Sequence, residues 1–451
     1  MQELLQIYIE NIHPIFPIVD VDAYQSMPPT SAEKILLSQS ICMAVSRERK
    51  AKPHLCLVTT VQATANGFSQ TVSSAAATLI DLGIVRDKLV LIQAMSLTSL
   101  FTQFSGDRQE PAELLSRAIC HAHTIGLHHE CRSSLQQQQI ATRVFCCLYA
   151  LDILNSACLG RPVQLHRRDF GRDLSKAIAA QDPCFCLFLQ VIQLMDRVIE
   201  IYRPGENGVW KGVFPSFEDL VGGVDSSDIP MHLIATVEVL YHAVAILSCH
   251  STNLHGVSRT GPHSSDSNIR QTLSASRVPH IVGEEFLGQL SLFPFVPYTV
   301  ALALRSSYHN LQQSRTLLFQ ERAKKQFVLN CAILRELGGD FYSALLMAEL
   351  GERLIKGLED QREQEQCQAQ SGRGGEGQGQ RQELFCGDNA VLGGSEDVWD
   401  QGHGTPTLHN SMEGQTQVRT EDTGVFDPMS FFGIFDDFEH EIESFAGVPS
   451  L

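Results

Sequence analysis

Four histidines in this sequence are of a type and spacing that could bind a metal ion. They lie close together at His121, His123, His128 and His129, and imidazole nitrogens are common zinc ligands. However, residues two apart on a helix point in different directions, and the pair at helical spacing, His121 and His128, lies on either side of Gly126. We therefore interpret these histidines as surface or capping residues and predict no metal site.

Two adjacent carboxylates near the end of the chain, Asp436 and Asp437, are the residue type that binds magnesium. A further carboxylate would be needed at position 440, where the sequence has His440. The sequence also contains no phosphate-binding loop, nucleophile elbow or zinc-protease helix. We predict no catalytic, cofactor-binding or metal-binding residues, and a protein that is not an enzyme.

Residues 143–169 predict a long buried helix that runs into a Gly-Arg-Pro turn, because apolar side chains in the helical part recur at spacings of three or four. Asp152 lies within this apolar face, where an unpaired carboxylate is strongly disfavoured. We expect Arg161 to be its partner, since Gly160 can end a helix in the left-handed conformation and Pro162 cannot continue one. We interpret Asp152 and Arg161 as structural residues rather than as contacts to an effector.

The rest of residues 1–358 predicts one helix after another. Ser31 can cap the first long helix, and residues 81–83 and 338–339 contain glycines that can separate neighbouring helices. No run combines strict alternation with β-branched residues, so we predict no sheet. Residues 251–276 are rich in Ser, His, Asn and Gly and predict an exposed insertion. The predicted fold class is all-α, a multi-helix array followed by a disordered C-terminal tail.

The composition changes after residue 358. Residues 359–425 are rich in Gln, Glu and Gly, with too few apolar side chains to offset the ordering of the chain, and predict a disordered linker. Residues 426–451 interleave phenylalanines with acidic residues, which is typical of a transactivation segment that binds coactivators. An alternative is a C-terminal helix docked on the core. The predicted transactivation residues are Phe431, Phe432, Phe435, Phe438, Asp436 and Asp437.

The composition of the whole chain narrows the class of protein. A content of 43% hydrophobic residues in 451 is enough for a large core, and a net charge of −17 argues against a broad nucleic-acid-binding face. No segment has about 18 uninterrupted apolar residues, and the N-terminus begins with Gln2 and Glu3 rather than a basic signal region. The chain is therefore predicted to be neither secreted nor membrane-spanning. The 13 cysteines are expected to be reduced thiols.

Three blocks of sequence, in this order, resemble the regulatory middle region of fungal zinc-cluster transcription factors. The first block contains His13, Pro14, Phe16, Pro17 and Asp20. The second contains Ala118, Ala122, Gly126, Leu127 and His128. The third contains Arg143, Phe145, Cys146, Tyr149, Asp152, Ser156, Gly160, Arg161 and Pro162, with the spacing from Arg143 to Phe145 one residue shorter than in the family. The resemblance covers roughly residues 1 to 350, and it weakens at residues 247–250, where the family often has Leu-His-Arg-Pro.

The resemblance implies a nuclear transcription regulator that controls a metabolic or secondary-metabolite gene set. It also implies coactivators as partners, and a homo- or hetero-dimer and a small-molecule effector as further candidates. The family's six-cysteine zinc cluster is absent from this chain, which has no C-x-x-C pair. We therefore expect no direct DNA contact from these residues. We expect bound zinc only if such a cluster precedes them. The alternative is a truncated interaction protein that pairs with or inhibits full-length zinc-cluster factors.

Overall fold

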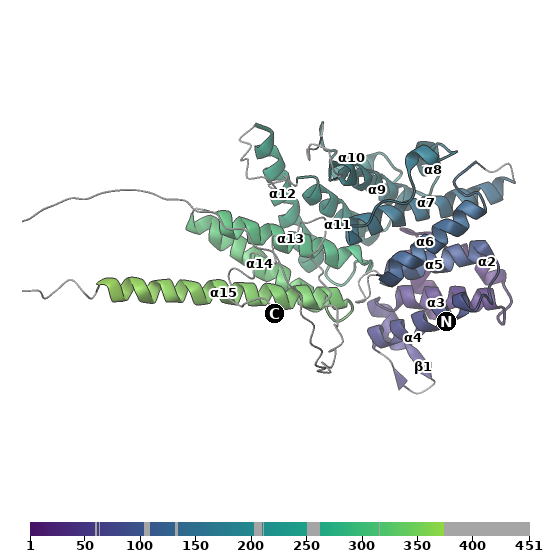
Figure 1. Ribbon diagram of the computed structural model, residues 1–451, viewed down its shortest axis with the longest axis horizontal. Helices are drawn as coiled ribbons and strands as arrows, with labels where there is room; N and C mark the ends of the chain where they lie inside the picture. The colour runs from purple at the N-terminus through teal and green to yellow at the C-terminus, as the bar shows by residue number, and fades with distance from the viewer. Residues whose placement is uncertain are drawn as a thin grey trace, which may run out of the picture. The chain divides into compact units, whose positions relative to one another are not determined.

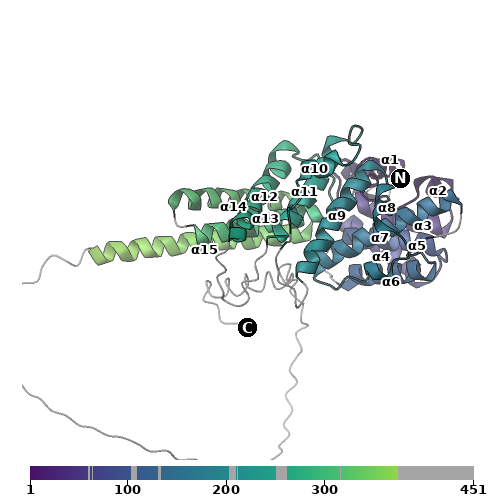
Figure 2. The same ribbon diagram turned by 90° about the horizontal axis from the view of Figure 1, so that it is seen from above.

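The computed structural model describes residues 1–373 except for 59–60, 63, 103–108, 131–133, 203–209, 211, 250–261 and 315. Nearly all regular structure in these residues is helical, which confirms the predicted all-α class. The helices up to residue 357 belong to one compact unit. Figures 1 and 2 show the order of the helices by colour along the chain.

The first part of the chain forms the helices that carry or flank the landmark residues. These helices are α1 (Gln2–Ile7), η1 (Tyr8–Ile12), α2 (Val21–Ser26), α3 (Ala32–Val45), η2 (Arg49–His54), α4 (Ala65–Asp81), α5 (Lys88–Thr102), α6 (Gln109–Thr124) and α7 (Leu135–Leu159). Helix α3 packs against α4 and α5, and α5 packs against α6. Both views show these helices gathered together (Figures 1 and 2).

The later helices form a second group. They are η3 (Arg167–Asp169), α8 (Leu174–Ala179), α9 (Pro183–Ile201), α10 (Phe217–Gly222), α11 (Met231–Leu247), α12 (Pro262–His280), η4 (Ile281–Glu285), α13 (Phe295–Gln313), α14 (Leu317–Leu337) and α15 (Tyr342–Arg373). Helix α13 packs against α11, α12 and α14. Helices α7 and α9 connect the two groups, because α7 contacts α5, α6 and α9, and α9 also contacts α11.

Local sequence signals account for several helix ends. Ser31 caps α3 as predicted, since its side chain accepts a hydrogen bond from the backbone N–H of Lys34 at 3.2 Å. Gly83 has a φ of 63° one residue past Leu82, which caps the C-terminal end of α4, and Gly338 follows α14. Glutamine-rich residues 136–139 belong to the start of α7, which the side chain of Ser134 caps. These helix ends could be predicted from the sequence because caps and glycine turns depend on only a few neighbouring residues.

Helix α7 contains a long continuous buried stretch, with every residue from Val144 to Cys158 buried. It is the one helix in the described part of the chain that is long and apolar enough to cross a membrane, but 78% of its apolar window is buried inside the protein. Other helices therefore cover its apolar surface. The cysteines that the structure describes are free thiols, and those on α7 are buried.

Three predictions about secondary structure need correction. Strands β1 (Cys56–Val58) and β2 (Val61–Gln62) pair as a short antiparallel hairpin, where we predicted no sheet; β-branched residues favour strands even in a run too short to show alternation. Helix α12 occupies most of the predicted insertion at 251–276, and Ala275 is buried in it. Helix α15 continues past residue 358 to Arg373, because Gln, Glu and Arg are good helix formers.

Candidate functional site

The turn after α7 is built around the carboxylate of Asp152. Gly160 follows the helix in the left-handed conformation, with a φ of 64°, and the chain then returns toward the helix. The Asp152 Oδ2 atom accepts hydrogen bonds from the backbone N–H of Gln164 at 2.9 Å and from that of Leu165 at 2.7 Å. Burial raises the pKa of Asp152 to about 6, although the two hydrogen bonds act in the opposite direction.

These backbone groups occupy the place that we predicted for Arg161. Asp152 is 2% exposed, whereas Arg161 and Pro162 are exposed residues. The predicted pairing of Asp152 with Arg161 is therefore wrong. A guanidinium loses much hydration when it is buried, whereas the backbone N–H groups of the turn must be satisfied in any case.

A second buried carboxylate, Asp196 on α9, connects the same motif to its surroundings. Tyr149 Oη donates a hydrogen bond to Asp196 Oδ2 at 2.9 Å, and Arg167 Nε donates to the same oxygen at 2.8 Å. Burial is the main cause that raises the pKa of Tyr149, and the Asp196 charge adds to it. These contacts join α7, α9 and η3.

The remaining motif residues contact the first block of landmarks and the turn. Arg143 lies 3.4 Å from the carboxylate of Asp20. The ring of Phe145 meets Phe170 edge-on at 4.9 Å, and the guanidinium of Arg172 lies 4.8 Å from the centre of the Phe145 ring. The motif thus connects four segments of the chain, and these contacts favour the structural role that we predicted for it.

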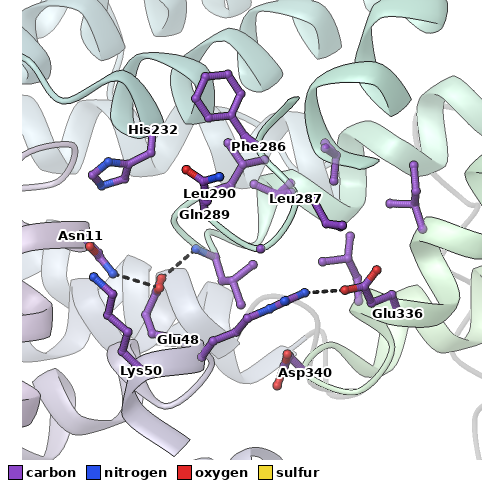
Figure 3. A pocket seen from close by; sticks show the side chains of 17 residues that line it. Asn11, Glu48, Lys50, His232, Phe286, Leu287, Gln289, Leu290, Glu336 and Asp340 are labelled. Carbon is purple, nitrogen blue, oxygen red and sulfur yellow. Dashed lines mark hydrogen bonds and ion pairs between the residues drawn. The ribbon is translucent and has the colours of Figure 1, made fainter. Parts of the chain in front are cut away.

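A pocket of about 240 Å³ lies between the N-terminal segment and the later helices (Figure 3). Its walls come from η1, η2, α11, η4 with the loop that follows, α13 and α14. The apolar side chains of the pocket include Val282, Phe286, Leu290, Leu292, Val296 and Ile333. The polar side chains include Asn11, Glu48, Lys50, His232, Glu336 and Asp340.

The carboxylate of Glu48 is the central polar group of this pocket (Figure 3). Its Oε1 atom accepts a hydrogen bond from the backbone N–H of Leu292 at 2.8 Å, and Oε2 accepts one from Asn11 Nδ2 at 3.0 Å. Burial raises the pKa of Glu48 to about 7, although these hydrogen bonds and the charge of Lys50 lower it. At neutral pH this group is therefore present in both its acid and its ionised form.

The other two carboxylates of the pocket have cationic partners. Arg49 forms an ion pair with Glu336, and Lys52 Nζ lies 2.8 Å from Asp340 Oδ1. Gly288, with a φ of 68°, lies directly against the Arg49 guanidinium, so that a Cβ atom there would overlap it. Glycine at this position therefore allows both the turn and the course of the Arg49 side chain.

Residues 47–52 connect the two groups of helices beside the pocket. Arg47 is buried, its Nε atom donates a hydrogen bond to the backbone oxygen of Asp340 at 3.2 Å, and its guanidinium lies 4.7 Å from the centre of the Phe341 ring. Burial lowers the pKa of Arg47 to about 10, and the charge of Asp340 opposes that shift. The pocket is thus adjacent to a joint between segments that are far apart in the sequence.

Sequence reasoning did not identify this pocket. Its polar groups come from positions 11, 48, 232 and 340, and no short motif connects them. The single local signal was a charged run around Glu48 at the end of an apolar helix, which is usually a solvated surface. That carboxylate is buried only in the tertiary structure, where Asn11 of η1 and the loop at Leu292 contact it.

The histidine cluster is closer in space than its sequence spacing suggested. The ring of His128 lies 4.9 Å from that of His123 and 3.9 Å from that of His129, beside a cavity of about 270 Å³ that His166 and Asp169 also line. Burial, followed by the neighbouring histidines, lowers the pKa of His128. Within the described residues, no group of three or more His, Cys, Asp or Glu is arranged to hold a metal ion.

The predicted linker from residue 374 onward and the predicted transactivation segment 426–451 lie outside the described residues. The same is true of the predicted transactivation residues, namely Phe431, Phe432, Phe435, Phe438, Asp436 and Asp437. Their roles stay predictions from the sequence.

Comparison with known proteins finds a similarity in the first part of the chain. Residues 5–174 match the fungal specific transcription factor domain. The chain is also similar to cutinase transcription factor 1 beta of Fusarium vanettenii, with 27% identity over 177 residues, which are 37% of this chain and 20% of that protein. No solved structure matches the chain. The match begins before the first block of landmark residues and ends after the third, so residues 5–174, which contain all three blocks, are similar to the fungal specific transcription factor domain.

Proposed function

We propose that this protein is a nuclear regulator of transcription in a fungus. The observation that carries the proposal is the family match over residues 5–174. The landmark residues of that region support it, since Asp20, Arg143 and Asp152 all make contacts that stabilise one helical scaffold. The similar protein is by name a transcription factor of cutinase, which favours a metabolic gene set among the candidates.

We propose further that the helical region responds to a small molecule in the Glu48 pocket. The pocket lies between η2 and α14, beside the contacts of Arg47 and Lys52 with Asp340. A ligand that binds more tightly to one arrangement of these segments than to another shifts the population toward it. Binding would in this way alter how the early and late helices hold together.

The acidic-aromatic segment 426–451 is the part that we propose contacts coactivators. Its phenylalanines can line one face of a helix that forms on binding, while its acidic residues keep the free segment in water. The helical region is the part that we propose pairs with a second copy or with a related factor. DNA contact belongs to neither part, given the net charge of −17.

A reporter assay tests the transcriptional role. Residues 360–451 and, separately, the whole chain are fused to an unrelated DNA-binding domain. We expect residues 360–451 to activate the reporter and the whole chain to activate it less. Silence of both fusions, at protein levels equal to an active control, would reject the activator role and favour the interaction protein that inhibits related factors.

Substitutions in the active fusion locate the activity. Changing Phe431, Phe435 and Phe438 together to alanine is expected to remove most of the activation. The matched control is Phe385→Ala, which removes a phenylalanine that the same fusion contains outside residues 426–451. Full activity of the triple variant would reject the assignment of residues 426–451.

A further inference from the structure

We propose that the Glu48 pocket binds a small apolar molecule that carries a primary ammonium group. The proposal rests on the proposed effector function of this pocket, and it adds the chemical class of the ligand. Three observations support it, namely the neutral partners of a buried carboxylate, the pairing of the other charges, and an apolar wall.

Glu48 supplies the anchor for the ammonium group. Glu48 is 5% exposed, and both hydrogen-bond partners of its carboxylate, the Leu292 N–H and the Asn11 side-chain amide, are neutral. An ionised carboxylate can accept about four hydrogen bonds, so acceptor positions are left for a ligand. The ionised form of Glu48 is a buried negative charge with neutral hydrogen-bond partners, and a cationic donor stabilises this form strongly because the attraction is screened little by water.

The other charged groups of the pocket are less suited to bind a ligand. Glu336 and Asp340 form ion pairs with Arg49 and Lys52, respectively. Lys50 is exposed, so its ammonium keeps its hydration and attracts an anion weakly. The pocket therefore favours a cation at Glu48 over an anion at Lys50.

The apolar side chains of the pocket select an apolar ligand body. Val282, Leu290 and Ile333 line the pocket and are each at most 7% exposed. The volume of about 240 Å³ corresponds to roughly eight water molecules at about 30 Å³ each. A branched alkyl chain of a few carbons fits this space and buries its surface against these side chains.

Titration of the purified full-length chain with 3-methylbutylamine, followed by ligand-observed NMR, tests the proposal. The uncharged 3-methylbutan-1-ol and the anionic 4-methylpentanoate serve as probes of the same shape. We expect the amine to bind at least tenfold more tightly than either. Tighter binding of the carboxylate than of the amine would overturn the proposal.

Two variants locate the site. Glu48→Gln keeps the size of the side chain and is expected to weaken amine binding at least tenfold, with the fold checked by circular dichroism. Leu287→Ser at the rim removes an apolar contact from a side chain that is 52% exposed and is expected to weaken binding about threefold or more. The Leu287→Ser variant keeps the proposal testable if Glu48→Gln does not fold, because substitution of an exposed side chain usually has little effect on stability. The matched control is Leu82→Ser, at a leucine that is 68% exposed and outside the pocket.

The results separate this proposal from the proposed function. Unchanged amine binding by folded Glu48→Gln, or equal loss in Leu287→Ser and Leu82→Ser, would overturn the ligand site. Failure of every probe to bind a chain that activates the reporter would reject the amine and leave the regulator standing. Specific binding by a chain that is silent in the reporter assay would retain the site and reject the activator role.

Discussion

The carboxylate of Asp152 is expected to stabilise the turn after α7, and two substitutions can measure this contribution. Asp152→Ala removes the acceptor of the Gln164 and Leu165 N–H groups. Asp152→Asn keeps an oxygen that can accept both hydrogen bonds but removes the charge. Both variants lose the negative charge. The difference between their free energies of unfolding therefore measures the contribution of the two hydrogen bonds.

The magnitude follows from the burial of the two donors. Leu165 is 4% exposed, and an unsatisfied buried N–H costs about 1 to 3 kcal/mol. Gln164 is an exposed residue, so water can replace its acceptor and the loss is about 0.5 to 1 kcal/mol. We expect Asp152→Ala to be less stable than Asp152→Asn by about 1.5 to 4 kcal/mol.

The pH dependence gives an independent check. The pKa of Asp152 is raised from 3.8 to about 6 in the folded chain, so the folded state binds the proton more tightly than the unfolded state. This contribution to stability is complete below pH 3.8 and is lost as the pH rises through 6, in total about 3 kcal/mol. Both variants should lack this loss.

Urea unfolding followed by far-UV circular dichroism measures both effects, with equal m-values as the condition for comparison. Equal stability of Asp152→Ala and Asp152→Asn would refute the role of the carboxylate in holding the turn. A parental pH dependence that survives in both variants would refute the assignment of the raised pKa to Asp152.

Three further predictions concern Glu48 and the glycines. The parent chain should lose about 3 kcal/mol of stability as the pH rises from 4.5 to 7, because burial raises the pKa of the Glu48 carboxyl from 4.5 to about 7. Glu48→Gln should abolish this loss. Urea unfolding across that pH range measures it, and the same dependence of stability on pH in the variant would contradict the prediction. Gly351→Ala should destabilise the chain by about 1 to 3 kcal/mol, since a Cβ there would lie 2.6 Å from Cys331 Sγ. Gly357→Ala on the same helix meets nothing within 4 Å and should stabilise by up to about 1 kcal/mol; the reverse order of melting temperatures would refute the packing argument. Gly160→Ala should cost about 1 to 2 kcal/mol, because a φ of 64° disfavours any residue with a Cβ, and an unchanged melting temperature would show that another helix end is equally good.

Much of the fold was predictable because helix signals are local. The apolar periodicity of α7, the cap at Ser31 and the left-handed glycine at Gly160 each depend on a few neighbouring residues. The errors arose where local chemistry was ambiguous. The β1–β2 hairpin is too short to show a period, and α12 and the end of α15 are helical despite polar sequences.

The sequence by itself determined the helical class, the order of the landmark blocks and the similarity of residues 5–174 to the fungal specific transcription factor domain. Tertiary structure alone decided which groups meet. It placed the Leu165 N–H rather than the Arg161 side chain against Asp152, and it brought Asn11, Glu48 and the loop at Leu292 together around one pocket. The physical reason is that caps and periodicity are properties of adjacent residues, whereas the burial of a charge depends on which distant segments exclude water from it.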